Sequence, residues 1–223
     1  NRAAIGGTAA ATGTDTISST LYNNTVNPIT VVHTYTLTAN GCTNTQDVSV
    51  VVNPTPKLSS SLTPPALCDS QIFNYTPMSG TLGSAFAWVR PFVLGIGLPA
   101  SSGTGNPNEQ MINNTHGNLN VTYVYTITAN GCTHVQNVVV AVRPTPMLST
   151  PLTGNTCSGV NYHYKPTGYT FGSSFIWNRA AVTGITPNTG TDTGVIDEVL
   201  VNATLAPITT RYRFVVTANG CSN

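Results

Sequence analysis

Charged residues are scarce in this sequence. Only 7% of the 223 residues are Asp, Glu, Lys or Arg, whereas an ordinary soluble domain has about 25%. The formal net charge is +1, so the chain lacks the concentrated positive charge with which proteins bind phosphates, and we expect no nucleic acid as a partner. Hydrophobic residues still make up 40% of the chain. That content argues against a disordered tract, because disorder combines low hydrophobicity with high charge.

Long apolar runs and catalytic motifs are also missing. The longest apolar run, residues 138–142, is far too short to span a bilayer, so we expect no membrane insertion. The sequence has no Gly-x-Ser-x-Gly elbow, no His-Glu-x-x-His, no phosphate-binding glycine loop and no Cys-x-x-Cys. We therefore expect no enzymatic activity, no cofactor and no metal site.

The most distinctive positive feature is a pentapeptide that occurs three times. Thr-Ala-Asn-Gly-Cys stands at residues 38–42, 128–132 and 217–221, so its cysteines are 90 and 89 residues apart. Recurrence at a fixed interval predicts tandem domains. Residues 1–56 form a partial β-sandwich repeat without its first strands, residues 57–146 a complete one, and residues 147–223 one without its last strand. Because the first and third copies are expected to be incomplete, we expect this chain to be a section, or window, of a longer array of repeats.

The titratable residues of these copies do not suggest a reactive site. The histidines occupy positions that differ between copies, which favours solvated strand residues over catalytic bases: His33, His116, His134 and His163. Glu109 and Glu198 are the acids at matching positions. Calcium needs about six to eight oxygens, usually from several carboxylates. The densest acidic cluster is Asp192, Asp197 and Glu198, but the nearby residues 103–107 of the middle copy include no acid. We expect solvated charges on edge strands instead.

Each copy has the pattern of short antiparallel strands. In the complete copy, the β-branched and aromatic run at 123–128 precedes Asn130 and Gly131, and a second run returns at 134–140. Asn-Gly between such runs is the strongest short-range hairpin signal, because both turn positions need positive φ. The same turn is expected at Asn40-Gly41 and Asn219-Gly220. With 20 glycines and 15 prolines, the chain is expected to be all-β, a linear array of antiparallel sandwiches.

The five cysteines offer a covalent staple for these small domains. Pairing within copies joins Cys68 to Cys132 and Cys157 to Cys221, and leaves Cys42 to pair outside the window. Pairing across the linkers joins Cys42 to Cys68 and Cys132 to Cys157. We expect the first arrangement, because in an immunoglobulin-like sandwich the chain begins at the same end as the last hairpin turn. Reduced, buried thiols are the alternative.

Two tryptophans stand at equivalent places. Trp88 follows Cys68 by 20 residues, and Trp177 follows Cys157 by the same number. A tryptophan at this point of a sandwich usually packs across the core against the other sheet. We expect a core role for both, rather than stacking on a sugar.

Several motifs taken together resemble a known family. They are Cys-Ser-Gly at 157–159, Tyr-x-Pro at 164–166, Phe-x-Trp-x-Arg-Ala-x-Val-x-Gly-Ile at 175–185, Tyr-Thr-Leu-Thr-Ala-Asn-Gly-Cys-Thr-Asn-Thr-Gln at 35–46 and Val-Asn-Pro-Thr-Pro at 52–56. This set resembles the PKD-like repeats of giant Bacteroidota surface proteins, which include gliding-motility adhesins exported by type IX secretion. The resemblance covers essentially the whole chain. It implies tandem immunoglobulin-like (PKD-like) sandwiches, an extracellular location at the cell surface, and no catalysis.

Smaller recurrences have modest interpretations. An arginine just after the tryptophan position suggests packing over an aromatic face, rather than ligand binding, for Arg2, Arg90 and Arg179. An Asn-x-Thr triplet suggests a turn, rather than a glycan acceptor, at Asn23, Asn113 and Asn202. Residues 15–17, Asp-Thr-Ile, resemble the short O-glycosylation signal of Bacteroidota.

These observations favour a stalk or adhesive fibre of a long cell-surface adhesin or filament. The expected partners are neighbouring repeats, other copies of the protein, surface glycans or solid surfaces. A homopolymeric structural filament or surface layer is an alternative. A carbohydrate-binding array is another, but none of its exposed aromatic candidates recurs in all three copies: Tyr22, Phe92 and Tyr169.

Overall fold

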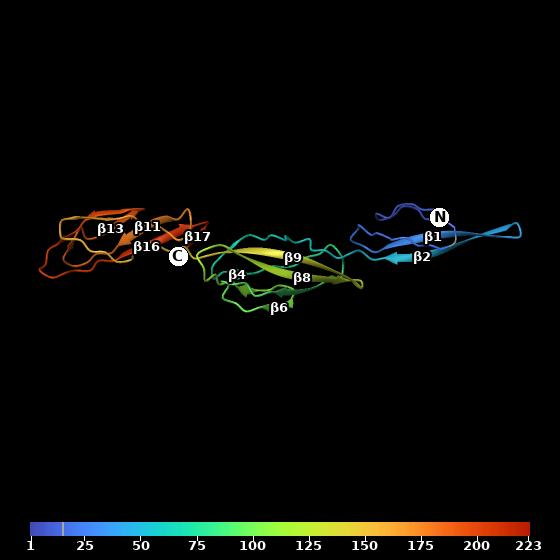
Figure 1. Ribbon diagram of the computed structural model, residues 1–223, viewed down its shortest axis with the longest axis horizontal. Coiled ribbons are helices and arrows are strands. Elements are labelled where there is room, and N and C mark those ends of the chain that lie inside the picture. The colour runs from blue at the N-terminus through green and yellow to red at the C-terminus, as the bar shows by residue number, and fades with distance from the viewer. Residues whose placement is uncertain (15) are drawn as a thin grey trace.

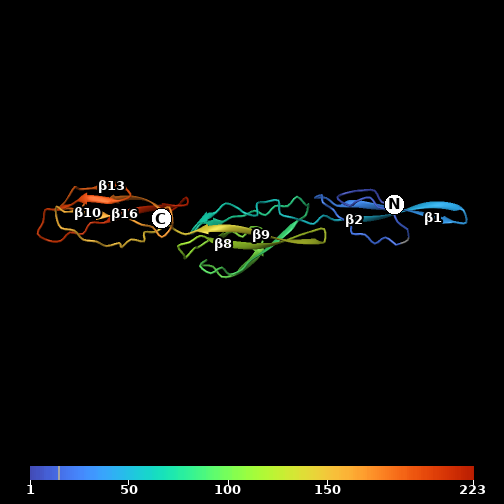
Figure 2. The ribbon, with the colours of Figure 1, turned by 45° about the horizontal axis from the view of Figure 1, so that its top comes forward.

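The computed structural model describes residues 1–14 and 16–223, and within them the chain is all-β, with several sheets and no helix. The strands fall into three groups that lie end to end along the long axis (Figures 1 and 2). We call them the N-terminal segment (1–56), the middle segment (57–146) and the C-terminal segment (147–223). None of the described residues forms a helix of the length and hydropathy that a membrane span requires.

The described residues of the N-terminal segment form one two-stranded antiparallel sheet. Its strands are β1 (Ile29–Ala39) and β2 (Cys42–Val52). Nearly all of β2 is exposed. Val31 on β1 is fully buried.

The middle segment has two sheets that pack on each other. A five-stranded sheet has the order β3-β9-β8-β5-β6, and a second sheet pairs β4 with β7. The strands are β3 (Leu67–Cys68), β4 (Ile72–Phe73), β5 (Ala85–Arg90), β6 (Ser101–Thr104), β7 (Glu109–Gln110), β8 (Leu119–Ala129) and β9 (Cys132–Arg143). Only β3 runs parallel to its neighbour, β9. The Phe73 ring from β4 lies 4.8 Å from the Tyr123 ring of β8, which places the core between the two sheets.

The period-2 pattern of the sequence forms this core. Alternate residues of a strand face the same side of a sheet, and on β8 these are fully buried: Val121, Tyr123, Tyr125 and Ile127. On β9 the fully buried set is Val138, Val140 and Val142. Trp88 on β5 is 5% exposed, and its ring meets that of Tyr123 edge-on at 5.4 Å.

The C-terminal segment repeats this architecture up to the hairpin. Its sheets have the orders β13-β11-β16-β17, β10-β14 and β12-β15. The strands are β10 (Asn161–Tyr164), β11 (Ser174–Arg179), β12 (Ile185–Thr186), β13 (Gly190–Thr193), β14 (Ile196–Val199), β15 (Val201–Asn202), β16 (Tyr212–Ala218) and β17 (Cys221–Ser222). Trp177 on β11 is 3% exposed and meets Tyr212 edge-on at 5.4 Å.

An open groove of about 820 Å³ marks the place that β9 fills in the middle segment. Its apolar lining includes Leu148, Ile185, Leu200 and Phe214. In the middle segment the Val139 amide donates to the Leu62 carbonyl and holds that loop against β9. The equivalent Leu152 has no such neighbour and is 78% exposed, compared with 38% for Leu62.

Each Thr-Ala-Asn-Gly-Cys sequence forms a tight hairpin turn. Asn and Gly both take positive φ in all three, with values of 51° and 77° at Asn40-Gly41, 51° and 75° at Asn130-Gly131, and 52° and 78° at Asn219-Gly220. Asparagine tolerates this conformation better than most residues, and glycine adopts it freely. The turns connect β1 to β2, β8 to β9 and β16 to β17.

Candidate functional site

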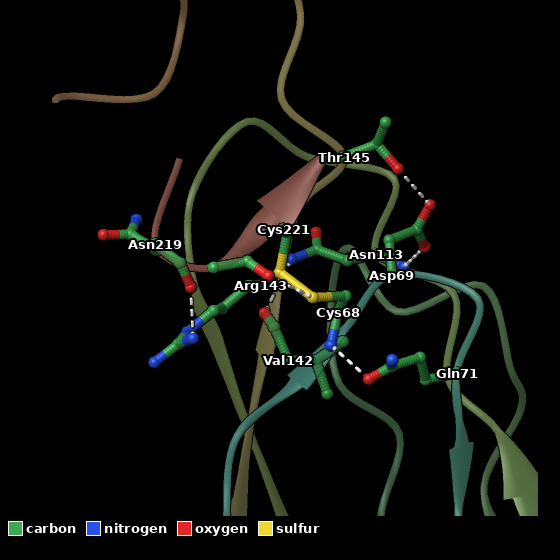
Figure 3. Close-up of a disulfide and its surroundings, with 10 residues drawn as sticks. Cys68, Asp69, Gln71, Asn113, Val142, Arg143, Thr145, Asn219 and Cys221 are labelled. Carbon is green, nitrogen blue, oxygen red and sulfur yellow. Dashed lines mark hydrogen bonds between the residues drawn. A yellow bond between two sulfur atoms is a disulfide. The ribbon is translucent and has the colours of Figure 1, made fainter. Parts of the chain in front are cut away.

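A disulfide crosses the junction between the middle and C-terminal segments (Figure 3). Cys68 at the end of β3 is bonded to Cys221 at the start of β17, with their Cα atoms 5.7 Å apart. The prediction that Cys68 pairs with Cys132, and Cys157 with Cys221, is therefore wrong. The alternative pairing across the linkers is wrong as well.

The direction of the hairpins explains why Cys68 pairs with Cys221. The β16–β17 turn points back toward the preceding segment, as the β8–β9 turn does (Figures 1 and 2). Cys221 thus meets the far end of the middle segment, where Cys68 lies. Within the described residues the other thiols are free, exposed at Cys42 and Cys157 and half-buried at Cys132.

Polar contacts hold both sides of the disulfide (Figure 3). The Arg143 guanidinium donates to the Asn219 carbonyl in the hairpin turn across the junction. Beside Cys68, Asp69 accepts from the Asn113 amide at 2.7 Å and from the Thr145 hydroxyl at 2.8 Å. These bonds tie the residue after Cys68 to the linker at 144–146, so the position of Cys68 is set by several parts of the middle segment.

The junction between the N-terminal and middle segments uses the same contacts. Asn53, which corresponds to Arg143, donates to the Asn130 carbonyl at 2.8 Å, as Arg143 does to Asn219. A methyl group on Gly80 would lie 3.0 Å from Val26 Cγ1, so these residues are close neighbours across the junction.

The counterparts of Val26 and Gly80 meet at the other junction. They are His116 and Tyr169, whose rings stack with centroids 4.1 Å apart. The prolines of both linkers are buried: Pro54, Pro56, Pro144 and Pro146. The two junctions therefore share one geometry. Cys132 lies at the junction between the N-terminal and middle segments in the place that Cys221 occupies at the junction between the middle and C-terminal segments.

A buried ion pair lies inside the middle segment. Arg90 is 1% exposed, and its Nε donates to Glu109 Oε2 at 2.7 Å. The Tyr123 hydroxyl donates to the same carboxylate at 2.5 Å. Burial alone raises the pKa of Glu109, but the bonds from Arg90 and Tyr123 outweigh it and hold the pKa below its ordinary value. Burial and the bond to Glu109 both raise the pKa of the Tyr123 hydroxyl.

The C-terminal segment holds the same cluster. Arg179 Nε donates to Glu198 Oε2 at 3.0 Å, and the Tyr212 hydroxyl donates to that oxygen at 2.6 Å. The expectation that Glu109 and Glu198 are solvated edge charges is wrong, because both neutralise a buried guanidinium. Arg179 also lies over the Tyr212 ring, 5.9 Å from its centroid, while the backbone carbonyls of Asn188 and Pro187 accept from its remaining nitrogens.

The N-terminal segment buries an arginine with different partners. Arg2 donates to the Ser19 hydroxyl at 2.9 Å and to the Ala9 carbonyl at 2.7 Å. Ser19 stands at the position of Glu109, and His33 at that of Tyr123. His33 is 7% exposed, so the expectation that it is solvated is wrong. These clusters are not among the features predicted from the sequence, although Arg, Glu and Tyr recur together at matching positions in the second and third copies.

The remaining candidates form no reactive site. His116 and His163 are exposed, and His134 is half-buried. The Asn-x-Thr triplets are turns, in which the asparagine side chain accepts from the amide two residues on: Asn23, Asn113 and Asn202. Among the residues that the structure describes, no three His, Cys, Asp or Glu side chains converge as metal ligands. Asp15, part of the glycosylation-like signal, lies outside these residues.

Comparison with known proteins adds no family. No protein-family model matches the chain, and no curated protein matches it significantly. The disulfide indicates an oxidising, non-cytoplasmic environment, because reducing compartments keep most protein thiols free.

Proposed function

We propose that this chain is a non-catalytic stretch of a long extracellular stalk or adhesive fibre at a cell surface, built from tandem immunoglobulin-like β-sandwiches. The sequence resemblance to PKD-like repeats of gliding-motility adhesins supports this proposal. The two-sheet core of the middle segment, with its antiparallel hairpins, is consistent with such a sandwich.

The observation that carries the proposal is the recurrence of one junction geometry. Asn53 with Asn130 and Arg143 with Asn219 are the same contact, made one copy further along the chain. A unit that binds its neighbour by one fixed geometry extends in one dimension as units are added. Each added copy therefore makes the fibre longer. A long fibre can hold an adhesive tip, or its own adhesive surface, away from the cell.

The linkers and the surface chemistry support a stiff, neutral fibre. Proline fixes φ and favours extended geometry, and the four linker prolines are packed into the junctions. With 7% charged residues, contacts of the fibre with glycans, solid surfaces or other fibres depend little on salt.

The proposal is tested by labelling living source cells with a fluorescent antibody raised against residues 57–146. Label on intact cells supports the surface location, and spots that travel along the cell support a motility adhesin. Fixed spots or shed threads would favour a structural filament. Label that appears only after the cells are permeabilised would overturn the proposal.

A further inference from the structure

We propose that the Cys68–Cys221 disulfide is a covalent bypass for tension, which carries a pulling force past the bodies of the middle and C-terminal segments. This inference deepens the proposed stalk function, since only a fibre that is pulled would use it. It rests on three observations: the course of residues 57–68, the position of the bond at the junction, and the direction of β17.

Residues 57–68 run the length of the middle segment beside β9. The Leu58 amide donates to the Gln136 side chain, the Leu62 carbonyl accepts from the Val139 amide, and β3 pairs with Val142 and Arg143. The order of these partners shows that the two chain stretches run in the same direction. A tension that enters at residue 57 therefore travels along an extended stretch to Cys68 at the opposite end.

The disulfide then passes that tension directly to the next segment. Cys221 begins β17, the strand that follows the hairpin turn and leads away from the junction. Because the sequence separation of the bonded cysteines is 153, residues 69–220 form a closed loop outside the pulled path. Both buried ion pairs lie in this loop, as do both tryptophans and the β8 and β16 strands.

Without the bond, the same tension would pass through every strand in turn. It would leave the middle segment at Arg143, the end of β9 that lies beside Cys68, cross the linker at 144–146 and then load the C-terminal segment. The disulfide removes this path, because Cys68 and Cys221 cannot separate. Unfolding of the loop, if it occurs, adds nothing to the length of the fibre.

The test is single-molecule stretching of the purified full chain between tags on its two termini. With about 3.6 Å per residue at full extension, the oxidised chain exposes only residues 1–68 and 221–223 and stretches to roughly 250 Å. The chain with Cys68→Ser and Cys221→Ser stretches to roughly 800 Å. The matched control, with Cys132→Ser and Cys157→Ser, keeps the short limit because neither residue is in the bond.

Two checks show that the difference in stretched length comes from the Cys68–Cys221 bond, and not from another cysteine pairing or from unfolding of the variant. Non-reducing peptide mapping of the oxidised chain must give a peptide that joins Cys68 to Cys221, and circular dichroism must show that the Cys68→Ser, Cys221→Ser chain retains its strands. Wild-type chain measured with and without a reducing agent gives the same comparison without any substitution, and reduction should lengthen it about threefold.

An oxidised wild-type chain that stretches to the length of the reduced one would overturn the bypass, and so would a different cysteine pairing. This outcome is independent of the proposed function, because the measurement uses purified protein and no cells. A fibre absent from the cell surface would leave the stretching limits unchanged, while a failed bypass would leave the surface label unchanged.

Discussion

The middle and C-terminal segments bury the same ion pair, although only the middle one has a long strand after its hairpin turn. Arg90 and Arg179 are both 1% exposed, and each is bonded to a glutamate and through it to a tyrosine. The strands that carry these residues, β5, β7 and β8 in one segment and β11, β14 and β16 in the other, are present in both. The polar half of the core therefore forms without a strand as long as β9.

The apolar half of the core differs between the two segments. Met111 is fully buried, whereas its counterpart Leu200 is 8% exposed and lines the open groove. Leu67 and Cys68 form β3 against β9, but Thr156 and Cys157 form no strand. The last strand thus closes the hydrophobic side and orders the leading cysteine, while the ion pair organises the opposite side on its own.

The strongest test of this division removes the carboxylate. Glu109→Ala leaves Arg90 buried without its partner, and we expect the middle segment to lose about 3–5 kcal/mol of stability. Glu198→Ala should cost the C-terminal segment a similar amount, because the cluster does not depend on the last strand. Hydrogen exchange of the 223-residue chain, followed in peptides from β8 and β16, measures each segment separately.

Glutamine at the same positions is the matched control for the loss of charge. Glu109→Gln and Glu198→Gln retain an acceptor oxygen, so each should cost less than its alanine counterpart. Protection in β16 that survives Glu198→Ala, while protection in β8 is lost in Glu109→Ala, would contradict the equivalence of the two clusters.

Cavity-forming substitutions should distinguish the two apolar halves. Met111→Ala opens a void in a closed core and should cost about 2–5 kcal/mol. Leu200→Ala, beside the groove, should cost about 2 kcal/mol or less, because solvent already reaches that side. The same exchange measurement reports both, and equal losses would show that the groove is closed in solution.

Removing one hydroxyl from each cluster is a finer test. Tyr123→Phe and Tyr212→Phe delete the donor to the carboxylate but keep the ring, and each should cost about 1.5–3 kcal/mol, as expected for a hydrogen bond to a charged group. The melting temperature of each variant checks this. If Tyr123→Phe leaves the melting temperature unchanged, Arg90 alone is enough to stabilise the Glu109 carboxylate.

The all-β fold could be predicted from the sequence because its signals are local. Alternating apolar residues define β8 and β9, and Asn-Gly defines the turns between them, so neither depends on distant contacts. The cysteine pairing could not be predicted in this way. It depends on which end of one segment meets the next, and the sequence of a single copy does not encode that direction.

The ion pairs were missed for a different reason. In a chain with so few charges, a glutamate is most simply interpreted as a surface residue, and its burial follows from the partner rather than from its own neighbours in sequence. Arg90, Glu109 and Tyr123 come from three strands, and only the sheet packing brings them together. Their joint recurrence at Arg179, Glu198 and Tyr212 was the available signal.

The smallest expected effect is the response to acid. The folded-state pKa values of Glu109 and Glu198 lie below the ordinary 4.5, because the bonds from arginine and tyrosine outweigh the effect of burial. The unfolded chain thus binds protons at a higher pH than the folded one, so this stabilisation is complete above about pH 6 and falls as the pH drops below 4.5. Urea unfolding at several pH values should show this loss. The double variant Glu109→Gln, Glu198→Gln should lose less unfolding free energy as the pH falls, since neither side chain then titrates. If the double variant loses as much as the wild type, the acid sensitivity comes from other carboxylates and the two ion pairs stay charged throughout.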